Sequence, residues 1–422
     1  ILAPEHTVAQ VKKLSTVTLS GYVKDLINSE TLPGAVVTIK GTNIKVTANS
    51  YGFYSLTLAP GVYTAESRYI GYNTKEATID LNQDKTVNFD MSMASTTIQE
   101  VVISAEKTNQ NLQHTQMGAV SVSVKSIKQL PALLGEADVV RTIQLLPGVS
   151  TVGEGAPGFN VRGGGIDQNL ILLDEAPVYN GSHLLGFFSV FNPDAVKDLT
   201  LMKSEMPARF GGRLSSLLDV RMKEGNSKNY AFAGGIGTIS SRFLAEGPIK
   251  KEKSSFILAG RRSYADLFLK LSSDSALKNT KVYFYDLTGK LNFTLSGKDK
   301  LFISSYAGRD VNKLGKEMNM DWGNRTTTAR WNHVFNSKLF SNFSAIYSDY
   351  TYMLGASGDD ASSFEWKANE KAHGLPERLP WSKHFPTFSG RGPTCLRPCQ
   401  IALRGHWKSS LSLTPHSGRS SE

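Results

Sequence analysis

The sequence predicts a mainly β protein made of three parts in order: a small β-sandwich, an α+β domain and a run of long antiparallel strands. Three observations predict this fold class. Short alternating segments separated by turn residues occupy residues 15–93, helical spacing appears once among the strands of residues 109–225, and long alternating strands fill residues 226–355. Because the sequence has no purely apolar stretch of about 18 residues, we expect no membrane-spanning helix.

The charge distribution excludes one class of function. The chain of 422 residues has a formal net charge of +10, which taken alone suggests a nucleic-acid partner. However, residues 366–422 hold nine of the Lys and Arg residues and three of the Asp and Glu residues, so they account for +6 of that charge. The rest of the chain has a mixed surface rather than a basic face that could follow a phosphate backbone. We therefore expect no nucleic-acid partner.

Residues 15–93 are predicted to form the β-sandwich. Apolar side chains alternate with polar ones from Val17 to Val23 and again from Val87 to Met93, which is the period of a half-buried strand. Turn signals such as Pro33-Gly34 and Pro60-Gly61 separate these segments. Several short strands at this spacing are typical of a small sandwich. Residues 1–14 have no apolar core of a signal peptide and are expected to be the remnant of a leader.

Residues 109–225 mix helix and strand. Val139, Ile143 and Leu146 share one helical face, and Pro147-Gly148 ends that helix. Strands are predicted around it at residues 120–124, 170–173, 197–202 and 217–222. This combination predicts an α+β domain between the sandwich and the long strands.

Residues 226–355 are predicted to be the initial strands of a membrane β-barrel. In the clearest strand, Leu287 and Leu291 lie on an apolar face, while Asp286 and Lys290 lie on the other. The strands are expected near residues 231–245, 254–266, 282–295, 301–310, 325–335 and 338–352. Short connections alternate with long ones at 267–281 and 311–324, which is the pattern of outer-membrane barrels. A soluble meander has the same alternation and stays an alternative.

Residues 356–422 are expected to form an irregular tail. Six prolines between positions 376 and 415 break strands, and the composition changes after Trp366. Both cysteines, Cys395 and Cys399, stand there near His384 and His406, but their spacing fits no zinc motif, so we expect no metal site. We interpret the tail as out of frame. The strands before it are too few to close a barrel, so we expect a truncated chain.

Three blocks in the middle of the chain resemble the plug domain of TonB-dependent outer-membrane receptors. They are Asn160-Val161-Arg162-Gly163-Gly164, Ile171-Leu172-Leu173-Asp174 and Pro207-Ala208-Arg209-Phe210-Gly211-Gly212. Each block is short, but the order and the flanks of all three match. The resemblance implies that residues 109–225 are the plug. It also implies a plug motif formed by Val161, Arg162, Gly163, Gly164, Asp174, Arg209, Gly211 and Gly212.

Two further segments extend the resemblance toward the N-terminus. Ser20-Gly21-Tyr22-Val23-Lys24-Asp25 and its neighbours resemble the carboxypeptidase regulatory-like domain, which is non-catalytic, similar to transthyretin, and often precedes the plug in receptors of Bacteroidetes type. Within the expected linker 94–108, a β-branched run resembles the TonB box, which pairs with TonB as an added strand. The implied TonB-binding residues are Gln99, Glu100, Val101, Val102, Ile103 and Ser104. An ordinary last strand is the alternative reading of this run.

The resemblance implies a receptor and transporter in the cell outer membrane, which binds an extracellular solute and imports it to the periplasm with energy from TonB. The implied partners are the periplasmic domain of TonB, outer-membrane lipid, and a small solute such as an iron chelate, cobalamin, a glycan or a peptide. A surface lipoprotein is allowed but not favoured, because Phe159-Asn160-Val161-Arg162 differs from the form found in glycan importers. The alternative is a non-transporting surface or periplasmic β-sandwich binding module.

No enzyme activity is expected, since the sequence contains no catalytic motif, and no cofactor is expected either. Charged residues of the plug are instead expected to meet charges on the barrel wall. Arg162 and Asp174 are the first candidates, followed by Arg209 and Arg213. Such pairs would fix the plug and remain separable, whereas the alternative is an exposed pair worth about 0–1 kcal/mol. His183 is expected in a loop or a core rather than at a ligand.

Overall fold

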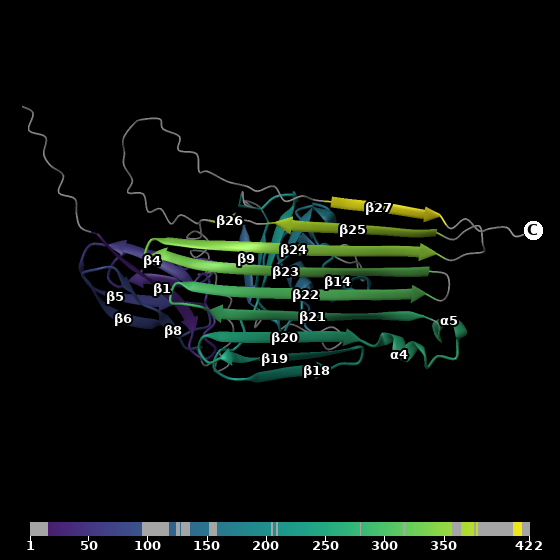
Figure 1. The fold of residues 1–422 in the computed structure, drawn as a ribbon, viewed down its shortest axis with the longest axis horizontal. Helices are drawn as coiled ribbons and strands as arrows, with labels where there is room; N and C mark the ends of the chain where they lie inside the picture. Colours follow the sequence, from purple (N-terminus) through teal and green to yellow (C-terminus); the bar gives the residue numbers. More distant parts are fainter. Residues whose placement is uncertain are drawn as a thin grey trace, which may run out of the picture. The chain divides into compact units, whose positions relative to one another are not determined.

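Figure 1 shows the computed structural model of the protein. It describes residues 16–94, 118–123, 127, 136–151, 158–203, 206–207, 210–278, 280–314, 318–356, 364–374, 377–378 and 408–415. The chain forms two compact units, of which the first contains residues 16–94 with the turn 334–341 and the second contains the other described residues. No helix in the described ranges is long and apolar enough to cross a membrane. Strands predominate in both units, so the predicted mainly β fold is confirmed.

The first unit is a sandwich of two sheets. In one sheet, β1 pairs with three strands: β4 (antiparallel), β7 and β8 (both parallel). These strands are β1 (Val17–Asp25), β4 (Phe53–Leu58), β7 (Lys85–Thr86) and β8 (Phe89–Met91). The other sheet has the order β3 (Lys45–Thr47), β2 (Val36–Ile39), β5 (Gly61–Arg68) and β6 (Lys75–Leu81).

The two sheets of this unit bury one shared core. Val23 and Tyr54 contribute to it from one sheet, and Val37 and Ile79 contribute from the other. The predicted β-sandwich is therefore confirmed. Gly21 shows why a small residue is needed in β1, because a Cβ there would collide with the Val87 carbonyl oxygen.

The second unit begins with an α+β region. Its five-stranded sheet has the order β13 (Ala176–Pro177), β12 (Asn169–Leu173), β17 (Ser216–Met222), β16 (Val196–Met202) and β9 (Ala119–Ser123). Helix α3 (Val139–Gln144) begins where Asp138 accepts hydrogen bonds from the amides of Val140 and Arg141. Two short ladders join β10 (Val149–Ser150) to β11 (Asn160–Val161) and β14 (Ser182–His183) to β15 (Phe188–Ser189).

The core of the α+β region is almost wholly built from its own strands and helix. Val139 and Ile143 of α3 pack with Leu199 of β16 and Leu218 of β17. One further member, Tyr306, comes from the sheet that follows in the sequence and is 1% exposed.

That following sheet, called here the long sheet, has ten antiparallel strands, of which nine lie side by side in chain order (Figure 1). Its strands are β18 (Ala231–Ile236), β19 (Ser240–Lys250), β20 (Ser254–Ser263), β21 (Lys281–Thr294), β22 (Asp299–Leu314), β23 (Met318–Asn336), β24 (Leu339–Ala356), β25 (Phe364–Gly374) and β27 (Lys408–Pro415), with β26 (Glu377–Arg378) beside β24. Two short helices, α4 (Ala265–Leu269) and α5 (Ser275–Lys278), lie in the connection between β20 and β21.

The long sheet has the reverse polarity of a soluble sheet. In β21 the side chains of Asp286 and Lys290 are buried, at 4% and 3% exposed. Tyr285 and Leu287, which alternate with them, are 47% and 49% exposed. The two faces are those that the sequence predicts, but the apolar face is the open one. The buried face contacts the α+β region.

Three sequence-based expectations about this sheet are wrong. The strand expected at 231–245 is two strands, β18 and β19, with Gly237 in the turn between them. Most of the loop expected at 311–324 is strand, because β22 and β23 continue into it with buried polar residues such as Asn312. The range 356–422, expected to be irregular, contains β25, β26 and β27. The prolines that argued against strands there stand outside β25 and β26 or, for Pro415, at the end of β27.

Replacing Phe89 by alanine should lower the free energy of unfolding of the sandwich by about 3–5 kcal/mol. The ring is 1% exposed and packs against Tyr54 with 5.8 Å between centroids. Urea unfolding of residues 16–94 expressed alone measures the change. Val62→Ala is the control, because Val62 is 69% exposed, and it should change stability by no more than about 0.5 kcal/mol. Equal losses for the two variants would contradict the described core.

Candidate functional site

The candidate site is the surface where the α+β region meets the buried face of the long sheet. Two groups of charged side chains lie there. The arginine cluster contains Glu136, His183, Arg261, Asp286, Tyr306 and Asp310. The lysine cluster contains Asp174, Glu175, Lys290 and Arg330. In both groups, side chains of the α+β region pair with side chains of the sheet.

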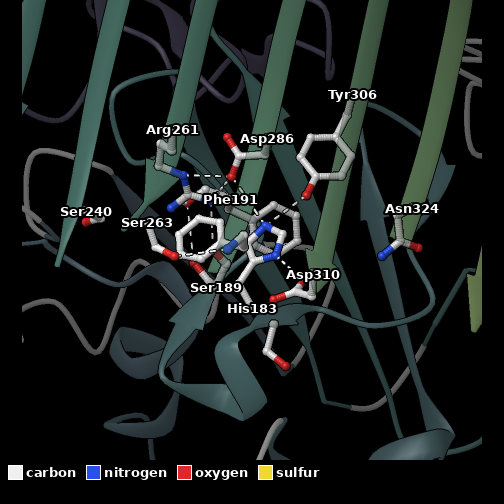
Figure 2. A network of polar contacts seen from close by, with 12 residues as sticks. His183, Ser189, Phe191, Ser240, Arg261, Ser263, Asp286, Tyr306, Asp310 and Asn324 are labelled. Atoms are coloured by element: carbon white, nitrogen blue, oxygen red, sulfur yellow. Dashed lines mark hydrogen bonds and ion pairs between the residues drawn. The ribbon is translucent and has the colours of Figure 1, made fainter. Parts of the chain in front are cut away.

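Arg261 of β20 is the centre of the arginine cluster (Figure 2). Its Nε and Nη2 atoms donate to Asp286 Oδ2 at 2.8 and 2.6 Å, and its Nη1 donates to Glu136 Oε1 at 2.5 Å. Nη2 also donates to the Ser189 carbonyl oxygen at 2.9 Å. The guanidinium is 1% exposed. Its planar set of donors therefore joins one acid of the sheet to two separate segments of the α+β region.

His183 fills the next position of the same cluster. Its Nδ1 lies 2.6 Å from Asp310 Oδ2, and its Nε2 lies 3.3 Å from Asp286 Oδ2 and 3.2 Å from the Tyr306 hydroxyl. The imidazole stacks on Phe284, with 4.3 Å between ring centroids and 7° between planes. Asp310 also holds the residue after His183, since the Leu184 amide donates to Asp310 Oδ1 at 2.8 Å. The expectation that His183 is a loop or core residue stays an interpretation. The geometry adds that it pairs with two buried carboxylates.

The surroundings of His183 favour its protonated form. Burial works against the charge and would lower the pKa, but the carboxylates of Asp310 and Asp286 outweigh burial and hold the pKa of His183 above its usual value. Geometry leads to the same conclusion, because each ring nitrogen faces a carboxylate and only the protonated ring can donate from both. The arginine cluster therefore combines two cations, Arg261 and His183, with buried acids.

The lysine cluster joins the turn after β12 to the sheet. Lys290 Nζ lies 2.9 Å from Asp174 Oδ2 and donates to the Met222 carbonyl oxygen at 3.1 Å. Burial would raise the pKa of Asp174, but Lys290 and Arg330 outweigh it and hold that pKa below its usual value. Asp174 has φ 45° and Glu175 has φ 78°, a region that costs a residue other than glycine on the order of 1–3 kcal/mol.

Neutral hydrogen bonds continue the contact beyond the two clusters. Asn324 of β23 accepts from the Tyr179 amide at 3.3 Å and donates to the Asn180 carbonyl oxygen at 3.0 Å. Ser348 of β24 donates to the Pro177 carbonyl oxygen at 2.7 Å. Polar side chains of five neighbouring strands, β20 to β24, thus reach the main chain or side chains of the α+β region.

A buried set of ion pairs of this kind does not add much net stability, because desolvation of the charges offsets their attraction. Removal of one partner is different, since it leaves a buried charge without compensation and costs about 3–5 kcal/mol. The two clusters therefore make one seating of the α+β region on the sheet much better than its neighbours. Chemically, they hold the two surfaces together through charge pairs.

The residues predicted from sequence have different places in this surface. Of the predicted plug motif, Asp174 lies in the contact and pairs with a sheet cation. Arg162, with φ 49°, is exposed, and Val161 is buried in the core of the α+β region. Gly163 has φ 81°, and a Cβ at Gly164 would collide with the Ser215 side chain, so both positions favour glycine.

Other predicted residues are not part of the contact. Gly211 and Gly212 stand in open space, the latter with φ 88°. Arg209 lies outside the described residues, and so do the six predicted TonB-binding residues, 99–104. Three residues of the contact, Arg261, Asp310 and Glu136, were not predicted from the sequence. A usable signal existed in β21, where Asp286 and Lys290 share the polar face.

The described residues offer no metal centre. Within those ranges, no group of three or more His, Cys, Asp or Glu side chains is arranged to hold an ion. Cys395, Cys399, His384 and His406 lie outside the described residues, so the expectation about that tail stays a prediction.

Comparison with protein families agrees with the order of the parts. Residues 19–103 match the CarboxypepD_reg-like domain, and residues 115–215 match the TonB-dependent Receptor Plug Domain. The resemblance predicted from sequence is therefore confirmed for both domains. The plug domain indicates the bacterial outer membrane as the location. A search of curated proteins found no match to the chain.

Three solved structures that are similar to part of this chain are two siderophore receptors and an outer membrane transporter. The siderophore receptor PirA from Acinetobacter baumannii is 15% identical, with a TM-score of 0.44, and the match covers 65% of this chain and 47% of that one. The receptor of the same name from Pseudomonas aeruginosa is 18% identical, with a TM-score of 0.42 and coverages of 62% and 50%. The outer membrane transporter YddB from Escherichia coli is 13% identical, with a TM-score of 0.48 and coverages of 64% and 46%. The matches span about half the length of these structures.

The raised pKa of His183 predicts that the seating of the plug weakens as pH rises. In the unfolded chain the histidine loses its proton near pH 6.5, at about its ordinary pKa, whereas in the folded chain it keeps the proton to higher pH. The contribution is therefore complete below about pH 6.5 and is lost as pH rises through the folded pKa. Over that window stability should fall by up to about 1.4 kcal/mol per pH unit. Urea unfolding of the detergent-solubilised chain at stepped pH measures this slope.

His183→Gln removes the titrating group and should flatten the profile. His333→Gln is the matched control, because His333 also lies 2.6 Å from a carboxylate, that of Asp299, but both side chains are partly exposed, at 23% and 25%. It should leave the slope in place. A wild-type profile that rises with pH across this window, or one that His183→Gln leaves unchanged, would show that the histidine is not held protonated.

Proposed function

We propose that this chain is part of a TonB-dependent outer-membrane receptor that binds a small extracellular solute and imports it to the periplasm with energy delivered by TonB. The observation that carries the proposal is the reversed polarity of the long sheet, together with a plug domain seated on its polar face. A sheet with an exposed apolar face and a buried charged face has the arrangement of a barrel wall in lipid. The plug match points to a transporter-type receptor rather than an enzyme.

The dimensions of the strands support the same conclusion. Strands β21 to β24 have 14, 16, 19 and 18 residues. A tilted strand needs about 9–11 residues to cross the hydrocarbon layer, so each of these is long enough to cross and to extend past it. The outer-membrane lipid is then the partner of the apolar face, whose exposed members include Phe232, Phe243, Leu258, Leu287 and Leu291.

Import requires that the plug be held and yet be movable, and the two charged clusters suit that need. Ion pairs between the plug and the sheet fix one position strongly, because each separated charge would be costly in a dry interior. Once water enters, the same charges are hydrated and the cost falls. We propose that a pull by TonB on residues 98–104 starts this change. The solute is a small molecule of the classes named above: an iron chelate, cobalamin, a glycan or a peptide.

The domain limits proposed from sequence are retained as part of this function. The regulatory-like domain is proposed for residues 15–93, the TonB box and linker for 94–108, the plug for 109–225 and the initial barrel strands for 226–355, to which β25, β26 and β27 are added. A surface lipoprotein partner is allowed but not favoured, because Phe159-Asn160-Val161-Arg162 differs from the form found in glycan importers.

A charge placed in the middle of the apolar face should disrupt membrane insertion. Leu287 is the midpoint of β21 and is 49% exposed, so Leu287→Arg should destabilise the membrane-inserted form by about 2–4 kcal/mol. Leu295→Arg, one residue beyond the end of the same strand and 63% exposed, should cost no more than about 1 kcal/mol. Urea unfolding from lipid vesicles measures both. In a soluble meander, by contrast, either arginine would face water and neither would matter.

Replacing Val102 by proline should abolish binding of the TonB periplasmic domain. Proline removes the amide that an added strand would use and fixes φ, so pairing at residues 98–104 is interrupted. Calorimetry with the purified TonB domain measures the affinity, and Val102→Thr, which keeps the amide and the β-branch, serves as the control. Undiminished binding by Val102→Pro would remove this segment as the site of energy coupling.

A further inference from the structure

The turn between β12 and β13 has a conformation that its residues do not favour. Leu173 pairs with Ala176, so Asp174 and Glu175 are the only two residues of the hairpin loop. Both have positive φ, at 45° and 78°. A two-residue loop with positive φ at both positions normally contains Asn-Gly or Asp-Gly, because glycine meets no steric penalty there. Here a glutamate occupies the position where glycine would be free of strain.

The first turn residue is held from two directions. The Asp174 amide donates to the Val220 carbonyl oxygen at 2.9 Å, and its Oδ1 accepts from the Met222 amide at 3.0 Å. Its Oδ2 lies 2.9 Å from Lys290 Nζ of the long sheet. The aspartate therefore links the turn to β17 within the plug and to β21 outside it.

The second turn residue faces the long sheet with its charge. Glu175 is 7% exposed, and its Oε1 lies 3.9 Å from Arg330 Nη1 of β23. The guanidinium of Arg330 is itself placed over the Phe302 ring, 4.4 Å from the centroid. Glycine at position 175 would relieve the backbone but would leave this buried cation without that carboxylate. Strain at such an outlier persists only where its surroundings enforce it.

We propose that the Asp174–Glu175 turn is a strained clasp, held in its left-handed conformation by Lys290 and Arg330 of the long sheet, which relaxes when the plug separates from these cations. While the plug is seated, the two ion pairs offset the strain and the hairpin β12–β13 is closed. When the cations are withdrawn, the strain is no longer offset and the hairpin loosens. The conformation of this hairpin at the edge of the plug therefore depends on whether the plug is seated on the sheet. Use of the clasp during import rests on the proposed function, whereas its mechanics do not.

Hydrogen exchange of the hairpin tests the clasp without any solute. The purified full chain in detergent is compared as wild type, Arg330→Met, Glu175→Gly and the double variant, and exchange is followed by mass spectrometry in peptides spanning residues 170–180. Arg330→Met should accelerate exchange by about tenfold, a coupling within the range measured for contacting residues. In the Glu175→Gly background, where position 175 is no longer strained and has no carboxylate to pair with Arg330, the same substitution should have at most about a twofold effect. Equal acceleration in both backgrounds would overturn the proposal.

Two further variants keep the test decisive if Arg330→Met disturbs the plug as a whole. Glu175→Gln retains the strained backbone and loses only the charge, so it should exchange as fast as Arg330→Met, and wild-type rates would refute the clasp. Arg330→Lys keeps a cation and should restore slow exchange. Arg309→Met is the matched control, because Arg309 pairs with Asp321 on the same sheet and is half exposed. It should leave the peptide unchanged. Failure of the chain to bind TonB or insert in lipid would count against the proposed function and leave these rates unaffected.

Discussion

A strand that buries its charges and exposes its apolar side chains is stable only under two conditions. Something polar must cover the buried face, and something other than water must cover the open one. In β21 both conditions apply to adjacent residues, because the Asp286 side chain is buried on one face and the Leu287 side chain is exposed on the other. The plug meets the first condition and lipid meets the second in the proposed function. The polar inner row of the sheet and its ion pairs with the plug both meet the first of these conditions.

The two clusters at the plug surface differ in the charges that the sheet presents to the plug. Around His183 the sheet presents the carboxylates of Asp286 and Asp310, whereas around the β12–β13 turn it presents Lys290 and Arg330. At the first place the plug contributes His183, together with the Glu136 carboxylate that pairs with Arg261 of the sheet. At the second place it contributes the carboxylates of Asp174 and Glu175. A plug displaced along β21 by the distance from Lys290 to Asp286 would bring Asp174 to a carboxylate, which costs free energy in a dry interior. Complementary signs therefore define a direction for the seating as well as a position.

Local patterns were sufficient for most elements because alternation and helical spacing extend over only a few residues. Asp286 and Lys290 could be assigned to one face because strand side chains alternate with a period of two residues. Helix α3 could be predicted because Val139 and Ile143 are four residues apart. Pairing partners could not be predicted in this way, since His183 and Asp310 are 127 positions apart and no residue near either one indicates the other.

The predicted motif residues show a second limit. Asp174 was predicted to meet a charge on the sheet and does so, whereas Arg162 was predicted on the same grounds and is exposed. A motif marks a position in the chain, while the direction of a side chain depends on tertiary packing. Strand ends were missed for a similar reason, because buried polar residues such as Asn312 resemble loop residues when no partner surface is known.

Tyr306 belongs to the long sheet by sequence and to the core of the plug by packing. The hydrophobic core therefore extends across the domain boundary that the sequence comparison or the composition defines. A plug excised at that border would have a gap the size of a phenol ring, and a sheet on its own would leave a bulky aromatic side chain uncovered on its polar face. Exchange of plugs between related receptors, whether by recombination or by design, is consequently constrained by a residue of the host wall. The unit that can be inherited or transplanted intact is the plug together with the part of β22 that completes it.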